Sequence, residues 1–522
     1  MDFTKMVMGL ELGSTRIKAV LVDENHVPVA SGSYDWENRL ENGVWTYSLD
    51  DIHTGVQACF AALQADVQEK YHEPLTNVGA MGVSAMMHGY MPFDENWQLL
   101  TPFRTWRNTM TGQAAAELTD LFHFNIPQRW SIAHLYQAVL NGEDHLPNLR
   151  HLTTLAGYIH YRLTGRHVLG VGEAAGMFPI ENGQPAYHEA MMQACEEKLA
   201  EKGYPWTLRQ VLPAVLPAGG DAGVLTQEGA KFLDPSGRLQ AGCPVAPAEG
   251  DAGTGMVATN SVRAYTGNVS AGTSDFAMVV VDRPLGVHRE IDMVATPTGL
   301  PVAMVHCNNC TSDINAWASL FGEVAGMLGV EIRRGPLLDK LFAAAMDGAP
   351  DGGGLMAFNY FSGEGVTDLD AGRPVFARTP DAPFTLADFM RTHLLSALAT
   401  LKIGLDILTG EEQVEIRRLC GHGGFFKAPK VGQTLLSAAV KAPVTVMETA
   451  GEGGPYGMAL LAGYRIWKEE GESLEDYLDK KVFHNATCTT LMAPPEEVAG
   501  FTAFLERYKK ALPMEKAAIE TI

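Results

Sequence analysis

Two short turns in the sequence carry the residue types that hold phosphate groups. The first consists of Gly13, Ser14 and Thr15, and the second of Gly272, Thr273 and Ser274. Glycine lets the backbone approach a ligand closely, and successive backbone N–H groups with neighbouring hydroxyls can surround phosphate oxygens. The two turns therefore predict a site that grips the tail of a nucleotide from both sides.

Asp251 is the candidate catalytic base. It lies in a tract of small residues, 248–253, which leaves room for a substrate. A hydroxyl nucleophile needs a carboxylate that accepts its proton. Asp is also a favoured N-cap, so the residues by themselves leave open whether Asp251 caps a helix or acts as a base.

Glu11 is a carboxylate at the end of an otherwise apolar strand pattern. Burying a carboxylate is costly unless it is paired or lies near a cation. One interpretation is that Glu11 serves Mg²⁺, through water. The other is that it lies at a strand edge and faces solvent.

Two later glycine tracts are also candidate binding segments. Residues 421–424 follow an apolar segment, 416–420, and a glycine-rich stop after a strand lets a flat group lie against the backbone. Residues 451–455 open a predicted helix over 456–468. The free N–H groups of such a helix start suit an anion.

The elements that position these residues begin with a predicted hairpin. Apolar residues at 6–10 and 17–22 flank the first turn, which indicates strand, turn and strand. A third strand is predicted over 27–33, a helix over 52–71 and a short strand over 78–84. The opening is therefore β-β-β-α-β, unlike the alternating pattern of a dinucleotide-binding fold.

An internal repeat connects the two turns. In each copy an Asp lies ten residues after the glycine, at Asp23 and Asp282, with three aliphatic residues before it. Two copies half a chain apart predict two related domains whose hairpins face a shared cleft. We place the boundary between Gly253 and Ala264, which gives domains of 1–258 and 259–522.

Composition limits the partners of the chain. Its 522 residues exceed what one hydrophobic core supports, and its net charge of −22 repels nucleic acids and anionic membranes. The start of the chain lacks the pattern of a secretory signal, and no apolar run approaches the ~18 residues that span a bilayer. The sequence predicts a cytoplasmic protein whose seven scattered cysteines are reduced; the Cys307 and Cys310 pair has no second pair at zinc spacing.

In order and spacing, the motifs resemble those of the FGGY carbohydrate kinases, which belong to the actin-like ATPase superfamily. The matching segments are residues 9–18, 87–89, 106–108, 250–251, 272–274, 360–364, 421–424 with Gln433, 452–459 and 494–496. The resemblance implies an α/β fold of two actin-like, ribonuclease H-like domains with the active-site cleft between them. It also implies transfer of a phosphoryl group from ATP to a ketose such as xylulose, and it allows a homodimer.

The resemblance assigns roles residue by residue. Asp251 becomes the catalytic base. Met87, His88, Gly89, Trp106, Asn108 and Asp251 become sugar-binding residues. Gly13, Ser14, Thr15, Lys18, Gly272, Thr273 and Ser274 contact the phosphates of ATP, and Gly423, Gly424 and Gln433 lie on the adenosine side. Glu11 and Asp251 serve Mg²⁺.

Four positions depart from the family pattern. Glu11 replaces an Asp, Ala85 stands where a Gln is common, and Asn108 replaces an Asp and lacks the Arg that usually follows. Bulky residues at 425–427 replace small ones. The sugar-side residues also have structural interpretations: His88 as a strand-end histidine, Trp106 as core packing and Asn108 as the cap of a helix over 113–122.

Three alternatives stay open at this stage. The first is a kinase for another sugar, such as ribulose, fuculose, a ketohexose or a polyol. The second is an actin-like ATPase that acts on a protein partner and needs no sugar pocket. The third is a catalytically silent sugar sensor, which the changes at Glu11 and Asn108 suggest and an intact Asp251 opposes.

Overall fold

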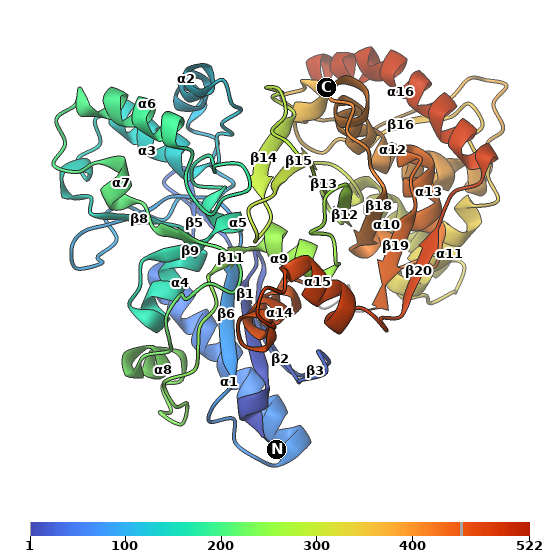
Figure 1. The fold of residues 1–522 in the computed structure, drawn as a ribbon. Coiled ribbons are helices and arrows are strands. Elements are labelled where there is room, and N and C mark those ends of the chain that lie inside the picture. The colour runs from blue at the N-terminus through green and yellow to red at the C-terminus, as the bar shows by residue number, and fades with distance from the viewer. Residues whose placement is uncertain (1, 449–452) are drawn as a thin grey trace.

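Two mixed β-sheets organise the chain (Figure 1). The computed structural model describes residues 2–448 and 453–522. The strands of the first sheet, in spatial order, are β11 (Glu249–Gly250), β6 (Ala80–Ala85), β1 (Val7–Leu12), β2 (Arg16–Val22) and β3 (Pro28–Asp35). Those of the second are β14 (Ile291–Ala295), β15 (Pro301–Cys307), β13 (Asp275–Val280), β12 (Thr266–Ala271), β18 (Arg418–His422), β19 (Val444–Met447) and β20 (Cys488–Leu491).

The two sheets share one topology. In the first, β1 runs antiparallel to β2 and parallel to β6, while β3 and β11 extend the two sides. In the second, β12 runs antiparallel to β13 and parallel to β18, while β15 and β19 extend the two sides. Strands β14 and β20 are additions at the edges of the second sheet. The structure therefore confirms the α/β fold and both hairpins, and it supplies the structural basis of the internal repeat.

Helix α1 (Leu49–Tyr71) confirms the predicted opening order. The side chain of Ser48 accepts a hydrogen bond from the backbone N–H of Asp51 and so begins the helix. A small hairpin of β4 (Arg39–Glu41) and β5 (Val44–Thr46), which the sequence did not predict, lies between β3 and α1.

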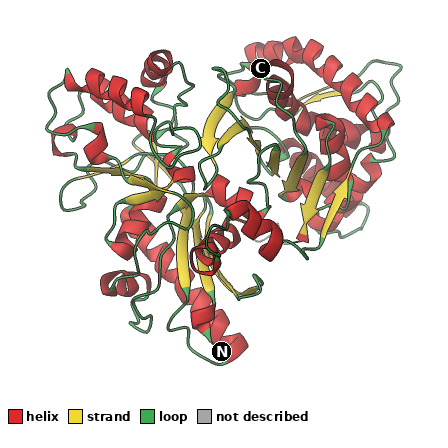
Figure 2. Ribbon diagram, in the orientation of Figure 1, coloured by secondary structure: helices red, strands yellow, loops and turns green. Residues whose placement is uncertain are grey.

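Helices surround both sheets (Figure 2). The first half contains α2 (Gly112–Phe122), α3 (Ser131–Asn141), α4 (Leu155–Thr164), α5 (Val171–Ala174), α6 (Glu189–Ala200), α7 (Leu208–Val211), α8 (Gln227–Leu233) and α9 (Asp251–Ala258), with the short strands β7 (Met91–Phe93), β8 (His151–Thr153), β9 (Val168–Gly170) and β10 (Ala214–Leu216). The second contains α10 (Ser312–Met327), α11 (Arg334–Ala345), α12 (Leu386–Asp406), α13 (Val431–Val440), α14 (Gly453–Trp467), α15 (Leu474–Tyr477) and α16 (Pro495–Thr521), with β16 (Met356–Phe358) and β17 (Val375–Ala377).

Helix α14 belongs to the core of the first half although it lies late in the sequence. Its buried residues Met458, Leu460 and Leu461 join the apolar cluster that contains β1, β2 and α1. Glycines permit this close packing: a Cβ on Gly9 of β1 would lie 1.9 Å from the carbonyl oxygen of Pro455. The chain therefore crosses from the second half back to the first.

One helical segment among the described residues, Leu386–Glu411, is long and apolar enough to cross a membrane. Two thirds of its apolar window, 67%, are buried inside the protein, where α12 packs against α11, α13 and β15. It also holds Arg391, whose fully buried side chain pairs with Glu497 of α16. These contacts are those of a core helix.

Candidate active site

Both glycine-hydroxyl hairpins reach one cavity of about 220 Å³ between the two halves. The first half contributes Ser14, Met86, Met87, His88, Trp106, Arg129, Asp251 and Ala252 to its lining, and the second contributes Ser274, Phe276, Met304 and His306. The structure thus brings Ser14, Ser274 and Asp251 together from positions far apart in the sequence.

Asp251 is the first residue of α9, and the N-cap is Gly250. The interpretation of Asp251 as the cap itself is therefore wrong. Its Oδ1 accepts hydrogen bonds from the backbone N–H groups of Ala252, at 2.9 Å, and Met87, at 3.3 Å. Burial nevertheless raises the pKa of Asp251 to about 6, since it outweighs these donors. The carboxyl is fixed in the cavity and titrates just below neutral pH.

Glu11 lies on β1 opposite Lys18 of β2, the lysine that the resemblance assigned to nucleotide binding. Burial and the nearby Asp251 carboxylate raise the pKa of Glu11 to about 8, while Lys18 opposes the rise. The start of α14 covers the carboxyl closely, because a Cβ on Gly454 would lie 2.0 Å from its Oε1. The structure therefore excludes the interpretation of a solvent-facing strand edge.

His88 and Met87 line the cavity just beyond β6. His88 is buried and has a left-handed backbone with a φ of 69°, a strained conformation that is frequent at functional sites. Its Nδ1 lies 3.3 Å from the carbonyl oxygen of Gly176, which can only accept, so Nδ1 carries the proton and Nε2 is an acceptor. Burial and the charge of Arg129 lower the pKa of His88 well below its usual value, which keeps the ring neutral.

Gly89 supports this loop and is absent from the cavity lining. Its φ is 92°, and its backbone N–H donates to the carbonyl oxygen of Arg129 at 3.2 Å. A side chain at this position would strain the backbone and approach the carbonyl oxygen of Arg104 to 2.8 Å. Gly89 thus connects His88 to the loop that carries Arg129.

Trp106 and Asn108 lie close in sequence and have different environments. Trp106 lines the cavity, and its Nε1 donates to Ser14 Oγ at 3.3 Å. Asn108 is buried outside the lining and bonds the backbone N–H and carbonyl of Trp45 at 2.9 and 2.8 Å. It does not cap α2, whose N-cap is Thr111, so that interpretation is wrong.

The three residues that the resemblance assigns to the adenosine side lie in different places in the second half of the chain. Gly423 follows β18 with a φ of 95°, and a Cβ there would lie 2.5 Å from the carbonyl oxygen of Ala271, the residue before Gly272. Gly424 opens the short helical turn after it. Gln433 is buried in α13, and its side chain bonds the backbone of Val444 and both the backbone and hydroxyl of Thr489. Those bonds tie α13 to β19 and β20.

Six residues of the lining were not among the predicted site residues: Met86, Arg129, Ala252, Phe276, Met304 and His306. Phe276 and His306 face each other across β13 and β15, with ring centroids 6.5 Å apart. Arg129 pairs with Asp292 of β14 and so joins the two halves beside the cavity. The alternation of these strands was a usable signal for Phe276 and His306, whereas Arg129 lies in a loop without a motif.

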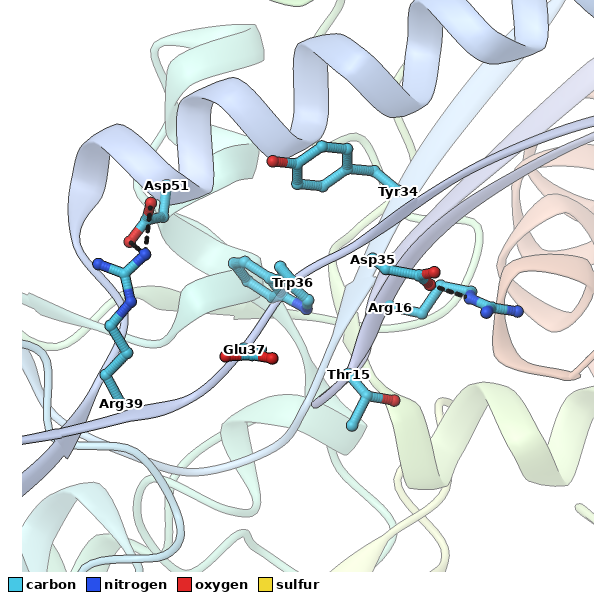
Figure 3. Close-up of a pocket in the computed structure, with 8 residues that line it drawn as sticks. All are labelled: Thr15, Arg16, Tyr34, Asp35, Trp36, Glu37, Arg39 and Asp51. Carbon is cyan, nitrogen blue, oxygen red and sulfur yellow. Dashed lines mark hydrogen bonds and ion pairs between the residues drawn. The ribbon is translucent and has the colours of Figure 1, made fainter.

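A larger cavity of about 610 Å³ borders the first hairpin at Thr15 (Figure 3). Its other lining residues are Arg16, Tyr34, Asp35, Trp36, Glu37, Arg39 and Asp51. The arginines are already paired, Arg16 with Asp35 at 2.5 Å and Arg39 with Asp51 at 3.3 Å. This cavity contains neither Asp251 nor a residue of the second hairpin, so the smaller cavity is the candidate active site.

Gly451 and Glu452 of the last glycine tract lie outside the described residues. The helix predicted over 456–468 is present as α14 (Gly453–Trp467), which begins three residues earlier than expected. Cys307 and Cys310 are buried free thiols whose pKa burial raises. Across residues 2–448 and 453–522, no group of three His, Cys, Asp or Glu side chains forms a metal site.

Comparisons with known proteins agree with this geometry. The N-terminal domain of the FGGY family of carbohydrate kinases matches residues 6–258, and its C-terminal domain matches residues 267–466. The chain is 22% identical over 445 residues to a xylulose kinase of Haemophilus influenzae, spanning 80% of this chain and 83% of that protein. It is 25% identical over 280 residues to the Escherichia coli xylulose kinase, spanning 52% and 53% of the two chains.

The fold of the chain is also similar to that of a solved xylulose kinase. The solved structure of a ligand-bound xylulose kinase from Lactobacillus acidophilus superposes with a TM-score of 0.77 at 17% identity, covering 98% of each chain. The two family domains together span most of the sequence. The chain therefore belongs to the FGGY family of carbohydrate kinases, enzymes that transfer a phosphoryl group from ATP to a sugar.

Proposed function

We propose that the protein phosphorylates a hydroxyl group of a ketose, D-xylulose or a related pentulose, with Asp251 as the catalytic base. The observation that carries this proposal is the position of Asp251 in the same cavity as Ser14 and Ser274, the cavity-facing hydroxyl residues of the two hairpins. A phosphoryl donor held by the hairpins and an acceptor beside Asp251 would meet within one small space, as phosphoryl transfer requires.

The proton transfer follows from the state of Asp251. Since its pKa is about 6, the carboxylate form prevails at neutral pH and can accept the proton of a sugar hydroxyl. The two backbone donors hold Oδ1, which orients the carboxyl toward the cavity. The sugar oxygen then attacks the terminal phosphorus of ATP in line with the leaving oxygen.

The remaining assignments place ATP along the second half. We assign the phosphates of ATP to Gly13, Ser14, Thr15, Lys18, Gly272, Thr273 and Ser274, of which Ser14 and Ser274 line the cavity. Adenosine lies near Gly423 and Gly424, which are next to the second hairpin. Gln433 supports that region through its bonds to β19 and β20.

Glu11 and Asp251 have the donor chemistry that suits Mg²⁺. Proteins hold this ion through one or two carboxylates together with water and substrate phosphate oxygens. Burial and the nearby Asp251 carboxylate raise the pKa of Glu11, and a divalent cation held between the two carboxyls would favour their ionised forms. Mg²⁺ bound by Glu11 and Asp251 would neutralise phosphate charge.

On the sugar side, Met87, His88 and Trp106 form one wall, with Gly89 behind them. Neutral His88 can accept a hydrogen bond from a sugar hydroxyl at Nε2, because Nδ1 is engaged with Gly176. Asn108 acts indirectly, since its side chain is committed to the backbone of Trp45.

A kinase for another ketose or a polyol is the second candidate. It is favoured by the sugar side of the cavity, where Ala85 and Asn108 replace the residues common in xylulokinases and Asn108 does not line the cavity. Family membership favours either sugar kinase over a partner-driven ATPase or a silent sensor. A cytoplasmic location, a homodimer and the absence of nucleic-acid and membrane partners stay predictions.

The test is direct measurement of ADP release with Mg²⁺ and ATP against ketopentoses, ketohexoses and polyols. We expect one sugar to stimulate turnover and Asp251→Ala to lower kcat by about 10²–10⁴-fold, the usual contribution of a general base. Asp282→Ala, at an exposed carboxyl bonded to Tyr265, is the matched control and should retain activity. A fully active Asp251→Ala variant would refute the mechanism, and stimulation by a polyol alone would refute the ketose assignment.

A further inference from the structure

Two aromatic side chains outside every motif hold the first hairpin from behind. Trp36 Nε1 donates to the carbonyl oxygen of Gly13 at 2.7 Å, and the Tyr47 hydroxyl donates to that of Ser14 at 2.6 Å. The backbone N–H of Trp36 donates to the carbonyl oxygen of Thr15 at 3.2 Å. All three carbonyl groups of the turn are therefore engaged.

These bonds set the direction of the amide groups. A trans peptide is planar, so the N–H of one residue points opposite to the carbonyl of the residue before it. With the carbonyl of Gly13 drawn to Trp36, the N–H of Ser14 points away from Trp36. With the carbonyl of Ser14 drawn to Tyr47, the N–H of Thr15 points away from Tyr47. Two successive amides turned to one side form an anion-binding surface.

The two aromatic residues are rigidly placed for this task. Trp36 and Tyr47 are 7% and 1% exposed, and their rings stack with centroids 4.1 Å apart. Burial raises the pKa of the Tyr47 hydroxyl, so it remains a proton donor throughout the neutral range. Figure 3 shows Trp36 beside Thr15, on the side of the larger cavity.

The geometry points to Trp36 and Tyr47 as positioning residues for the nucleotide: they hold the first hairpin so that the amides of Ser14 and Thr15 face the phosphates of ATP. This inference rests on the proposed role of the hairpins in holding ATP, and it does not depend on which sugar is phosphorylated.

Calorimetric binding of a non-hydrolysable ATP analogue, adenylyl imidodiphosphate with Mg²⁺, tests it without a sugar. Tyr47→Phe removes one hydroxyl donor and Trp36→Phe removes one indole donor, while each keeps an aromatic ring in place. We expect each variant to bind the analogue about 5- to 10-fold more weakly, because an unsatisfied carbonyl frees the turn to rotate. Tyr34→Phe, whose ring lines the same larger cavity, is the matched control and should bind like wild type.

The outcomes distinguish the positioning role of Trp36 and Tyr47 from the proposed use of the first hairpin to bind ATP. Equal analogue affinity in wild type, Tyr47→Phe and Trp36→Phe would overturn the positioning role, even if the variants melted at lower temperature. Weaker binding with an unchanged KM for the sugar would support it. A wild-type protein that fails to bind the analogue would instead overturn the proposed use of the hairpin for ATP. If Trp36→Phe folds poorly, Tyr47→Phe alone decides, since it deletes a single oxygen atom.

Discussion

The two glycine-hydroxyl hairpins occupy the same place in two sheets of the same topology, yet different groups hold them. The first depends on the side chains of Trp36 and Tyr47, which bond the carbonyls of Gly13 and Ser14. In the second, the backbone N–H groups of Thr311 and Cys310 bond the carbonyls of Gly272 and Thr273 at 3.0 and 2.9 Å.

The turns also differ in length. Four residues lie between the last paired residues of the first hairpin, Leu12 and Ile17, and three lie between those of the second, Ala271 and Asp275. Equal spacing from glycine to the terminal Asp therefore conceals different turns. In both turns the carbonyl groups of the first two residues accept hydrogen bonds. The hydrogen-bond pattern is therefore kept although the donors differ. A backbone donor survives side-chain substitution, whereas an indole or phenol donor does not.

The largest expected effect concerns the titration of Asp251, which acts in the chemical step and belongs to neither hairpin. Asp251 acts as a base only when ionised, and burial raises its pKa to about 6, so the active form is lost as the pH falls through that value. We expect kcat/KM to fall about tenfold per pH unit below pH 6, because one proton inactivates the base.

Chromatographic measurement of ADP between pH 5 and 8 checks this, and it avoids enzymes that couple ADP to another signal. Wild-type activity that stays level down to pH 5 would show that Asp251 is not the titrating base. The hairpins would then have to contribute to the rate of phosphoryl transfer as well as to the binding of ATP.

A smaller effect is expected when the first glycine of each turn, Gly13 or Gly272, is replaced by alanine. A Cβ on Gly13 would lie 3.1 Å from the carbonyl oxygen of Arg16, whereas one on Gly272 would come no closer than 4.0 Å to the carbonyl oxygen of Ser274. We expect Gly13→Ala to lower the free energy of unfolding by about 1 kcal/mol more than Gly272→Ala, because the tighter turn must shift.

Denaturant unfolding of both variants without ligands measures the difference. The two proteins share the same substitution in equivalent turns, so each is the control for the other. Equal destabilisation would break the distinction between a crowded first turn and an open second one.

The smallest expected effect concerns the donors of the second hairpin. Thr311→Val deletes the hydroxyl that bonds the carbonyl oxygen of Gly272 at 2.6 Å but keeps the backbone N–H bond to the same atom. We expect the affinity for the ATP analogue to change by less than about twofold, since the carbonyl stays satisfied. A loss as large as that of Tyr47→Phe, measured by the same calorimetry, would show that side chains control both hairpins alike.

Local patterns in the sequence were enough to predict the β1–β2 and β12–β13 hairpins and the β-β-β-α-β opening. Alternation and turn residues act within a few positions, so Gly13 and Gly272 could be recognised directly. The positions of Trp36 and Tyr47 could not, because their donors reach the hairpin only after β3 and the small β4–β5 hairpin have folded back. Asn108 and Gln433 were predicted as ligand contacts from the family pattern, whereas their side chains bond neighbouring backbone, which depends on tertiary packing.

The return of α14 to the first sheet has a consequence for synthesis on the ribosome. The side chains of Met458, Leu460 and Leu461 complete an apolar core that also contains Phe3. One side of that core therefore stays uncovered until α14 has been translated. The N-terminal sheet must wait with apolar surface exposed, and chaperones would have most reason to bind the nascent chain during that interval. Completion of this core would then be timed by the synthesis of α14, residues 453–467, rather than by that of the first half of the chain.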